Sequence, residues 1–224
     1  MRNLLLLIAA LLALTPARAA VPDWTRTITM TADGAFVQGN PKAPTHLIEY
    51  ISYTCPHCAL FVAEASKPLR DGRVRRGLVK IELRNAIRDP YDLAAAVLAR
   101  CGGKGRFFAD HEALFAQQAA WLPRVEAYEA ARGDKPSTDA AARLADIAAA
   151  TGLIDFMAKR GLSPQLQRKC LADRKTPELL AAMARNAWAV RKIGGTPAFA
   201  INGALLSGVH DWAGLNAALP ASPK

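Results

Sequence analysis

Two cysteines separated by two residues form the group in this sequence best suited to chemistry. Cys55 and Cys58 flank Pro56 and His57. At this spacing on the first turn of a helix, two thiols can close a disulfide, and that disulfide can exchange with a thiol of another protein. A strand that leads into a Cys-x-x-Cys helix start is the context in which such pairs act in redox reactions. The sequence therefore predicts a dithiol/disulfide site.

The order of these four residues predicts which sulfur reacts. If Cys55 is the N-cap, Pro56 takes the first helical position, where its fixed φ is favourable and its missing N–H is no loss. The amides of His57 and Cys58 then point unpaired toward the Cys55 sulfur, where the helix dipole is positive. We expect Cys55 to be the exposed, acidic thiol and Cys58, which faces the protein, to be the resolving thiol.

The helix dipole is too weak to acidify the thiol by itself. Lowering a thiol pKa from about 8.5 to about 4 requires roughly 6 kcal/mol, whereas a helix end contributes roughly 0.3 to 2 kcal/mol. Hydrogen bonds to the thiolate, at roughly 1.5–3 kcal/mol each, must contribute the rest, and His57 can add a donor or a positive charge. A stabilised thiolate favours the reduced pair, so the disulfide should readily oxidise other thiols.

The residues before the cysteines must position them. Residues 46–53 form a branched and aromatic run of strand length,. Glu49 shares a face of this strand with Leu47 and Ile51, which predicts either a partly buried acid beneath the active site or a frayed strand edge. A buried carboxylate could accept a proton from Cys58 or shift the pKa of that thiol.

The N-terminus has the pattern of an export signal. A basic start, an apolar run over residues 4–14 and the small residues around Arg18 predict a signal peptide over residues 1–19, although an uncleaved anchor remains an alternative,. Export to the periplasm places the chain where cysteines can stay paired. The other two cysteines, Cys101 and Cys170, then form either a structural disulfide or two buried thiols.

Charge gives little support for nucleic-acid binding. The chain has 224 residues and a formal net charge of +10, but the basic stretch 70–76 contains no aromatic residues and is better explained as a solvated surface. The charge favours approach to anionic membrane surfaces or acidic clients.

The remaining pattern is α/β at both ends and helical in the middle. Turn residues and periodicity predict a hairpin over 25–38, a helix from Cys55 that ends or kinks at Pro68, a loop over 72–77 and a strand over 78–83. From 91 to 174 the chain is alanine-rich and helical, with Trp121 in its core and His111 either in the core or at a surface edge rather than a metal ligand. A helix from Thr176, a hairpin at Asn202-Gly203 and a helix over 212–219 follow.

These features together resemble the DsbA family of exported oxidoreductases. The likeness rests on the signal peptide, the strand ending in Cys-Pro-His-Cys, the helical interruption and a late Gly-Gly-Thr-Pro, residues 194–197. It implies an α/β thioredoxin fold with an inserted all-helical subdomain. The expected division is 20–88 with 176–224 for the thioredoxin-like domain and 89–175 for the insert.

The resemblance also implies an activity. It implies a protein-disulfide oxidoreductase with a reactive thiol of low pKa at Cys55, a resolving thiol at Cys58 and an acid beneath the disulfide at Glu49. It implies a cis bond between Thr196 and Pro197, which would lie beside bound peptide. The expected partners are unfolded exported proteins with free thiols and a membrane quinone-linked oxidase that restores the disulfide, and no cofactor is expected.

Two other functions stay open. The nearest is a disulfide isomerase or reductase, although such proteins commonly dimerise through a separate N-terminal domain, for which residues 20–45 are too few; we therefore expect a monomer. A different class is a metal-delivery protein that binds zinc or copper through Cys55, His57 and Cys58, but a second pair of ligands at suitable spacing is missing, and we expect no metal.

Overall fold

The protein is described by a computed structural model that covers residues 22–133 and 139–221. The expected signal peptide, residues 1–19, lies outside these ranges. Within them, no helix is both long enough and apolar enough to cross a membrane.

A mixed six-stranded sheet forms the centre of the fold, with the strand order β1-β2-β4-β3-β5-β6. Strands β3 and β4 run parallel, and the other neighbours pair antiparallel. This arrangement, with helices on both faces, is the predicted thioredoxin fold. The strands are β1 (Ile28–Met30), β2 (Phe36–Gln38), β3 (Thr45–Ile51), β4 (Val79–Asn85), β5 (Ala198–Ile201) and β6 (Ala204–Leu205).

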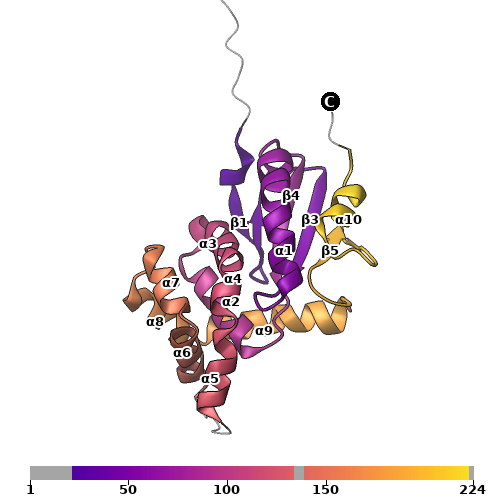
Figure 1. The fold of residues 1–224 in the computed structure, drawn as a ribbon. Helices are drawn as coiled ribbons and strands as arrows, with labels where there is room; N and C mark the ends of the chain where they lie inside the picture. The colour runs from indigo at the N-terminus through magenta and orange to yellow at the C-terminus, as the bar shows by residue number, and fades with distance from the viewer. Residues whose placement is uncertain (1–21, 134–138, 222–224) are drawn as a thin grey trace, which may run out of the picture.

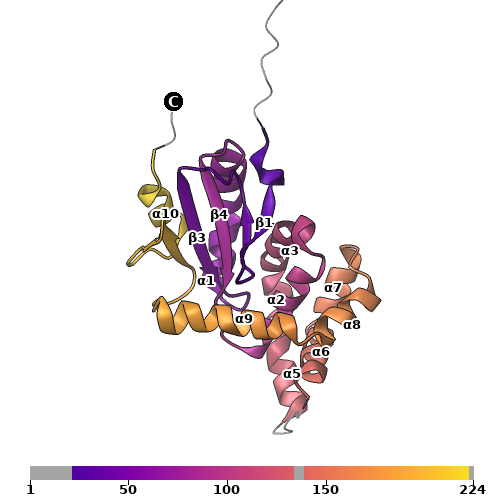
Figure 2. The ribbon, with the colours of Figure 1, turned by 180° about the vertical axis from the view of Figure 1, so that it is seen from behind.

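The two faces of β3 pack against different helices because side chains alternate along a strand. Leu47 and Ile51 belong to the cluster that includes α1 (Pro56–Ala65) and α10 (Trp212–Ala218). Tyr50 belongs to a second cluster, which includes residues of η3 (Asn186–Val190), the continuation of α9 (Lys175–Arg185). Seen from behind, α9 runs across the end of the sheet (Figure 2).

The helices between β4 and α9 gather on one side of the sheet (Figure 1). Their first member begins where the Asp89 carboxylate accepts a hydrogen bond from the Asp92 amide at 2.7 Å, which is the capping that a helix start requires. Trp121 is buried in this region, as predicted, and His111 is also buried, which is the first of its two expected places. The helices are α2 (Pro90–Cys101), α3 (Lys104–Ala116), α4 (Gln118–Trp121), α5 (Arg124–Arg132), α6 (Ala140–Ala150), α7 (Leu153–Lys159) and α8 (Pro164–Ala172).

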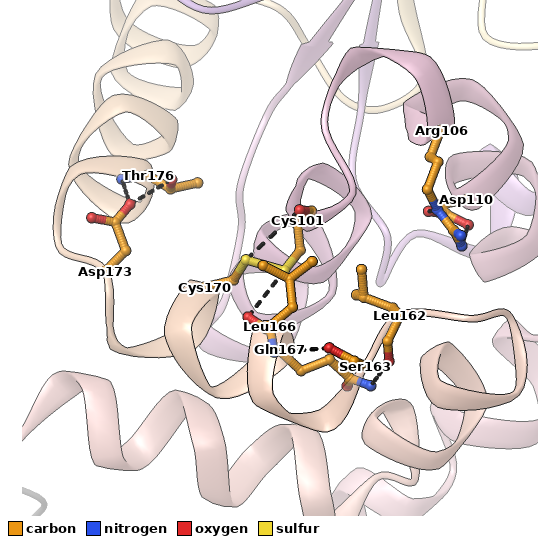
Figure 3. Close-up of a disulfide and its surroundings, with 10 residues drawn as sticks. All are labelled: Cys101, Arg106, Asp110, Leu162, Ser163, Leu166, Gln167, Cys170, Asp173 and Thr176. Carbon is orange, nitrogen blue, oxygen red and sulfur yellow. Dashed lines mark hydrogen bonds and ion pairs between the residues drawn. A yellow bond between two sulfur atoms is a disulfide. The ribbon is translucent and has the colours of Figure 1, made fainter.

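A disulfide joins the end of α2 to α8. Cys101 and Cys170 are bonded, with their Cα atoms 5.7 Å apart and 69 positions apart in sequence (Figure 3). The helical region and the sheet also share one hydrophobic cluster. In it, the rings of Phe36 on β2 and Phe107 on α3 lie 4.2 Å apart. The helical region is therefore held to the sheet by hydrophobic packing, and the disulfide links α2 to α8 within it.

Some predicted boundaries are wrong. Pro68 does not stop the helix: after α1 the chain continues as a π-helical segment, η2 (Ser66–Val74). Pro68 is the third residue of this segment, and the winding changes from α to π just before it, where a proline has no N–H to bond an earlier carbonyl oxygen. Buried Leu69 and Val74 hold the segment against the core, where a loop was expected. Likewise, α9 begins at Lys175, and the Asp173 carboxylate, which accepts from the Thr176 amide at 3.0 Å, provides its cap.

Candidate active site

The two cysteines lie at the start of α1, which leaves the end of β3 through a short turn. Cys55 is the N-cap residue with extended backbone, and Pro56 is the first helical residue, as predicted. Both thiols are reduced in this structure. The Cys58 amide donates a hydrogen bond to the Cys55 carbonyl oxygen at 3.1 Å, and it also acts on the Cys55 thiol, as expected, because it is among the groups that lower the pKa of that thiol.

The reactive sulfur is covered rather than exposed. Cys55 is 2% exposed and Cys58 is fully buried. The expectation of an exposed Cys55 was wrong because a distant segment lies over it: the thiol donates a hydrogen bond to the Thr196 carbonyl oxygen at 3.0 Å. Pro56 and His57, between the two cysteines, are exposed.

The two thiols differ sharply in acidity. The pKa of Cys55 is lowered to about 5, first by a hydrogen bond from the Cys58 thiol and then, against the effect of burial, by Thr196, the Cys58 amide and the charge of Arg88. Burial, followed by the interaction with Cys55, raises the pKa of Cys58 far above its ordinary range. His57 is not among the main influences on the pKa of Cys55. One thiol is thus ionised at neutral pH while its neighbour stays protonated.

Thr196 and Pro197 bring the start of β5 beside the sulfur. Their peptide bond is cis. The Thr196 hydroxyl is buried and has no hydrogen-bond partner, so it is a donor available to a thiolate. His210 Nδ1 lies 2.7 Å from the Pro197 carbonyl oxygen, to which it must donate because a carbonyl only accepts,. His210 was not singled out from the sequence.

Glu49 is a buried acid rather than a residue at a frayed strand edge. It is 5% exposed, on the face of β3 beneath α1, and its Oε1 has no hydrogen-bond partner. It lines a cavity of about 30 Å³ together with Phe61 and Val62 of α1 and Glu112 of α3, which is large enough to admit water. Burial and then the nearby Glu112 raise the pKa of Glu49 to about 8, so it is mostly protonated at neutral pH.

The inserted helices hold the turn before Cys55. Gln118 on α4 donates hydrogen bonds from Nε2 to the carbonyl oxygens of Tyr53 at 2.7 Å and Cys55 at 3.0 Å. Asp92 on α2 accepts from the Tyr53 amide at 2.7 Å. Neither residue was identified from the sequence, because a lone glutamine or aspartate in a helical stretch carries no signal of such a contact.

The site is a pair of reduced cysteines at a helix start, beside a cis proline. On this fold, such a pair places the chain in the class of thioredoxin-fold proteins that carry a dithiol site. Its sequence matches the family model described as Thioredoxin over residues 31–221. The chain belongs to the thioredoxin family.

Solved structures agree with this assignment. A protein-disulfide isomerase from Novosphingobium aromaticivorans is 37% identical, with a TM-score of 0.76, and the match covers 81% of this chain and 93% of that one. α-DsbA1 of Wolbachia pipientis is 21% identical, with a TM-score of 0.66, over 85% of this chain and 91% of that one. The fold is therefore that of the DsbA-like proteins.

Curated relatives in Rickettsia carry provisional names as protein-disulfide oxidoreductases. The protein from Rickettsia bellii is 29% identical over 168 residues, which is 75% of this chain and 56% of the relative. The protein from Rickettsia conorii is 30% identical over 172 residues, which is 76% of this chain and 54% of the relative. The chain spans about half the length of these relatives.

Proposed function

We propose that this chain is a thiol:disulfide oxidoreductase that donates its disulfide to exported proteins with free thiols. The observation that carries this proposal is the contrast between a Cys55 pKa of about 5 and a raised Cys58 pKa. An ionised Cys55 stabilises the reduced pair, and a stable reduced pair makes the disulfide a strong oxidant.

The reaction proceeds by two exchanges. A client thiolate attacks Cys55 Sγ of the oxidised protein, the bond to Cys58 breaks, and Cys58 leaves with the electron pair. A second client thiolate then attacks the client sulfur of the mixed disulfide and expels Cys55, which leaves readily because its pKa is low. The client gains one disulfide and the chain becomes a dithiol, so two electrons pass between them.

Glu49 has a proton-transfer role in this scheme. When Cys58 leaves, it becomes a buried thiolate whose pKa is raised, so it must take up a proton. Glu49 lies beneath the same helix and, with a pKa of about 8, is mostly protonated at pH 7. It can supply that proton, and it can accept the proton when the pair is reoxidised.

The same proposal includes a cellular setting. The chain acts in the periplasm as a monomer without a cofactor, after removal of residues 1–19. Thr196 and Pro197 contact the client beside Cys55. A membrane quinone-linked oxidase restores the disulfide, because each turnover leaves a dithiol that needs an external oxidant.

The second candidate is a disulfide isomerase or reductase, because the relative that is 37% identical is titled a protein-disulfide isomerase. An isomerase must be reduced to attack a wrong disulfide, whereas a donor must be oxidised. The metal-delivery alternative has less support: among the residues that the structure describes, no three His, Cys, Asp or Glu side chains are grouped as a metal site requires.

Incubation of the purified, oxidised protein with a reduced unfolded client tests the proposal. We expect stoichiometric transfer of one disulfide per chain, and loss of transfer in Cys55→Ser. Activity of only the reduced protein on a client with scrambled disulfides would identify an isomerase instead. Retained transfer in Cys55→Ser would overturn the mechanism.

A further inference from the structure

Arg88 lies at the junction between β4 and α2 and contacts the turn that leads to Cys55. Its Nε donates a hydrogen bond to Ser52 Oγ at 3.1 Å, and its Nη2 donates to Thr54 Oγ1 at 3.3 Å. The guanidinium therefore binds the two hydroxyl side chains on either side of Tyr53. Two anchors restrict the orientation of a planar group that would otherwise be mobile.

The turn that carries these hydroxyls is itself fixed relative to the nucleophile. The Cys55 amide donates to the Ser52 carbonyl oxygen at 3.1 Å. Thr54 Oγ1 donates to Asp89 Oδ2 at 2.6 Å, and both Ser52 and Thr54 are buried. A charge attached to this turn thus has a defined position with respect to the Cys55 sulfur.

Arg88 is among the main influences on the pKa of Cys55, whereas the two acids beside it, Asp89 and Asp92, are not. Asp89 accepts hydrogen bonds from the Thr54 hydroxyl and from the Asp92 amide. Asp92 accepts from the Arg88 amide at 3.1 Å, but burial raises its pKa to about 7, so it is about half protonated at neutral pH. Arg185 lines the same groove as Arg88 and adds positive charge.

We propose that Arg88 is a positioning residue that holds a fixed positive charge beside the Cys55 thiolate, with Ser52 and Thr54 as its anchors. A cation close to a thiol favours the ionised form, and Arg88 is among the groups that lower the pKa of Cys55. The consequence for oxidising power rests on the proposed function, because a less stable thiolate makes the disulfide a weaker oxidant.

Replacement of the charge and of the anchors separately tests this role. Arg88→Met removes the charge, Arg88→Lys keeps it but loses the planar fork, and Ser52→Ala/Thr54→Val keeps it but removes its anchors. The matched control is Arg84→Met, because Arg84 lies on β4, four residues before Arg88, and bonds two other side chains, those of Glu82 and Asp33. The readout is the pH dependence of Cys55 alkylation in the reduced protein, followed on the Cys55 peptide by mass spectrometry, together with urea unfolding.

We expect the pH midpoint of Cys55 alkylation to rise by about half a pH unit to one unit in Arg88→Met. The equilibrium constant for oxidation of glutathione should fall about three- to tenfold, or about 15–30 mV. Arg88→Lys should recover more than half of the shift in midpoint, although it loses as much stability in urea as Arg88→Met. The double anchor variant should show a smaller shift than Arg88→Met, and Arg84→Met should show none.

An unchanged midpoint in Arg88→Met would overturn the proposal. Equal shifts in the Met and Lys variants would do so too, since they would show that Arg88 acts through turn structure rather than charge. An unshifted anchor variant would remove the role of Ser52 and Thr54. If the wild-type protein fails to oxidise a client, the proposed function fails, while the alkylation midpoints still decide the role of Arg88.

Discussion

The sulfur of Cys55 lies 3.0 Å from the carbonyl oxygen of Thr196, a residue 141 positions further along the chain. As a thiol, Cys55 donates to this oxygen. Once Cys55 ionises that bond is lost, and the sulfur needs donors in its place. The Cys58 thiol and the buried, unpartnered Thr196 hydroxyl are the side chains placed to donate. Thr196 therefore has an acceptor that bonds the Cys55 thiol and a donor that is free to bond the thiolate.

Removal of the Thr196 hydroxyl should weaken the thiolate. Thr196→Val keeps the shape of the side chain but leaves the thiolate one donor short, and a hydrogen bond to a charged group is worth about 1.5–3 kcal/mol. We expect the pKa of Cys55 to rise by about one unit, measured by the pH dependence of alkylation. Thr196→Ser, which keeps the hydroxyl, is the control. A pKa that is the same in the Val and Ser variants would show that the hydroxyl does not bond the sulfur.

The stability of the reduced protein should depend on pH through Cys55. The folded pKa is lowered from 9.0 to about 5, so the ionised thiol stabilises the fold fully above pH 9, and this contribution is lost as the pH falls toward 5. We expect the free energy of unfolding of the reduced protein, relative to the oxidised protein, to fall by roughly 2 kcal/mol between pH 7 and pH 5. Urea unfolding of both forms at each pH gives this difference, in which other titrating groups largely cancel. A difference independent of pH would contradict the low pKa.

Glu49→Gln should stabilise the protein at high pH and slow its chemistry. The pKa of Glu49 is raised from 4.5 to about 8, so the wild-type side chain favours folding below pH 4.5 and progressively loses that contribution as the pH rises through 8. We expect a gain of about 1–3 kcal/mol in the free energy of unfolding at pH 8 and no gain at pH 4. Stopped-flow measurement of client oxidation should show a slower first exchange, because the proton donor to Cys58 is missing.

The control for Glu49 is Glu64→Gln, since Glu64 is an exposed acid on α1. It should change neither stability nor rate. A Glu49→Gln variant with an unchanged rate would remove the proton-transfer role while leaving the buried acid as a structural fact.

Gln118→Leu should loosen the turn before the nucleophile. The variant keeps the apolar volume but leaves the carbonyl oxygens of Tyr53 and Cys55 without their side-chain donor, which costs about 1–3 kcal/mol. We expect a lower urea midpoint and faster hydrogen exchange of the Tyr53 and Cys55 amides. Gln117→Leu, at the exposed neighbouring position, should leave both quantities unchanged. Equal exchange in the two variants would rule out a role for Gln118 in holding the turn.

Loss of the Cys101–Cys170 disulfide should lower the stability of the protein and leave the pKa of Cys55 unchanged. The bond closes a long loop of 69 positions, and removal of such a bond costs about 2–5 kcal/mol. We expect Cys101→Ser/Cys170→Ser to unfold at lower urea concentration with the Cys55 pKa unchanged. A shift of that pKa would indicate that the helical region transmits its packing to the active site.

Most of the fold follows from local pattern. The alternation in β3, the Asn202-Gly203 turn and the helical periodicity after Pro90 each act over a few residues, so the sequence carries them directly. The π-helical segment through Pro68 was not predicted, because the cause of that winding is tertiary: Leu69 and Val74 pack into the core.

The active site was predictable only in part, for the same reason. The N-cap position of Cys55 and the proline after it are local features. The burial of Cys55 beneath Thr196 and the contacts of Arg88 and Gln118 join residues from 34 to 141 positions apart. No periodicity reports such pairs, and the Arg88-Asp89-Pro90 sequence suggested only a boundary between elements.

The contacts from Asp92 and Gln118 limit how this protein can be simplified. Both side chains belong to the region between β4 and α9, and both bind backbone groups of the turn at Tyr53. A smaller variant that retained the sheet and α1 but lacked residues 89–175 would keep both cysteines. It would lose the side-chain hydrogen bonds that hold the turn before them. The added helices and the dithiol must therefore be engineered as one unit.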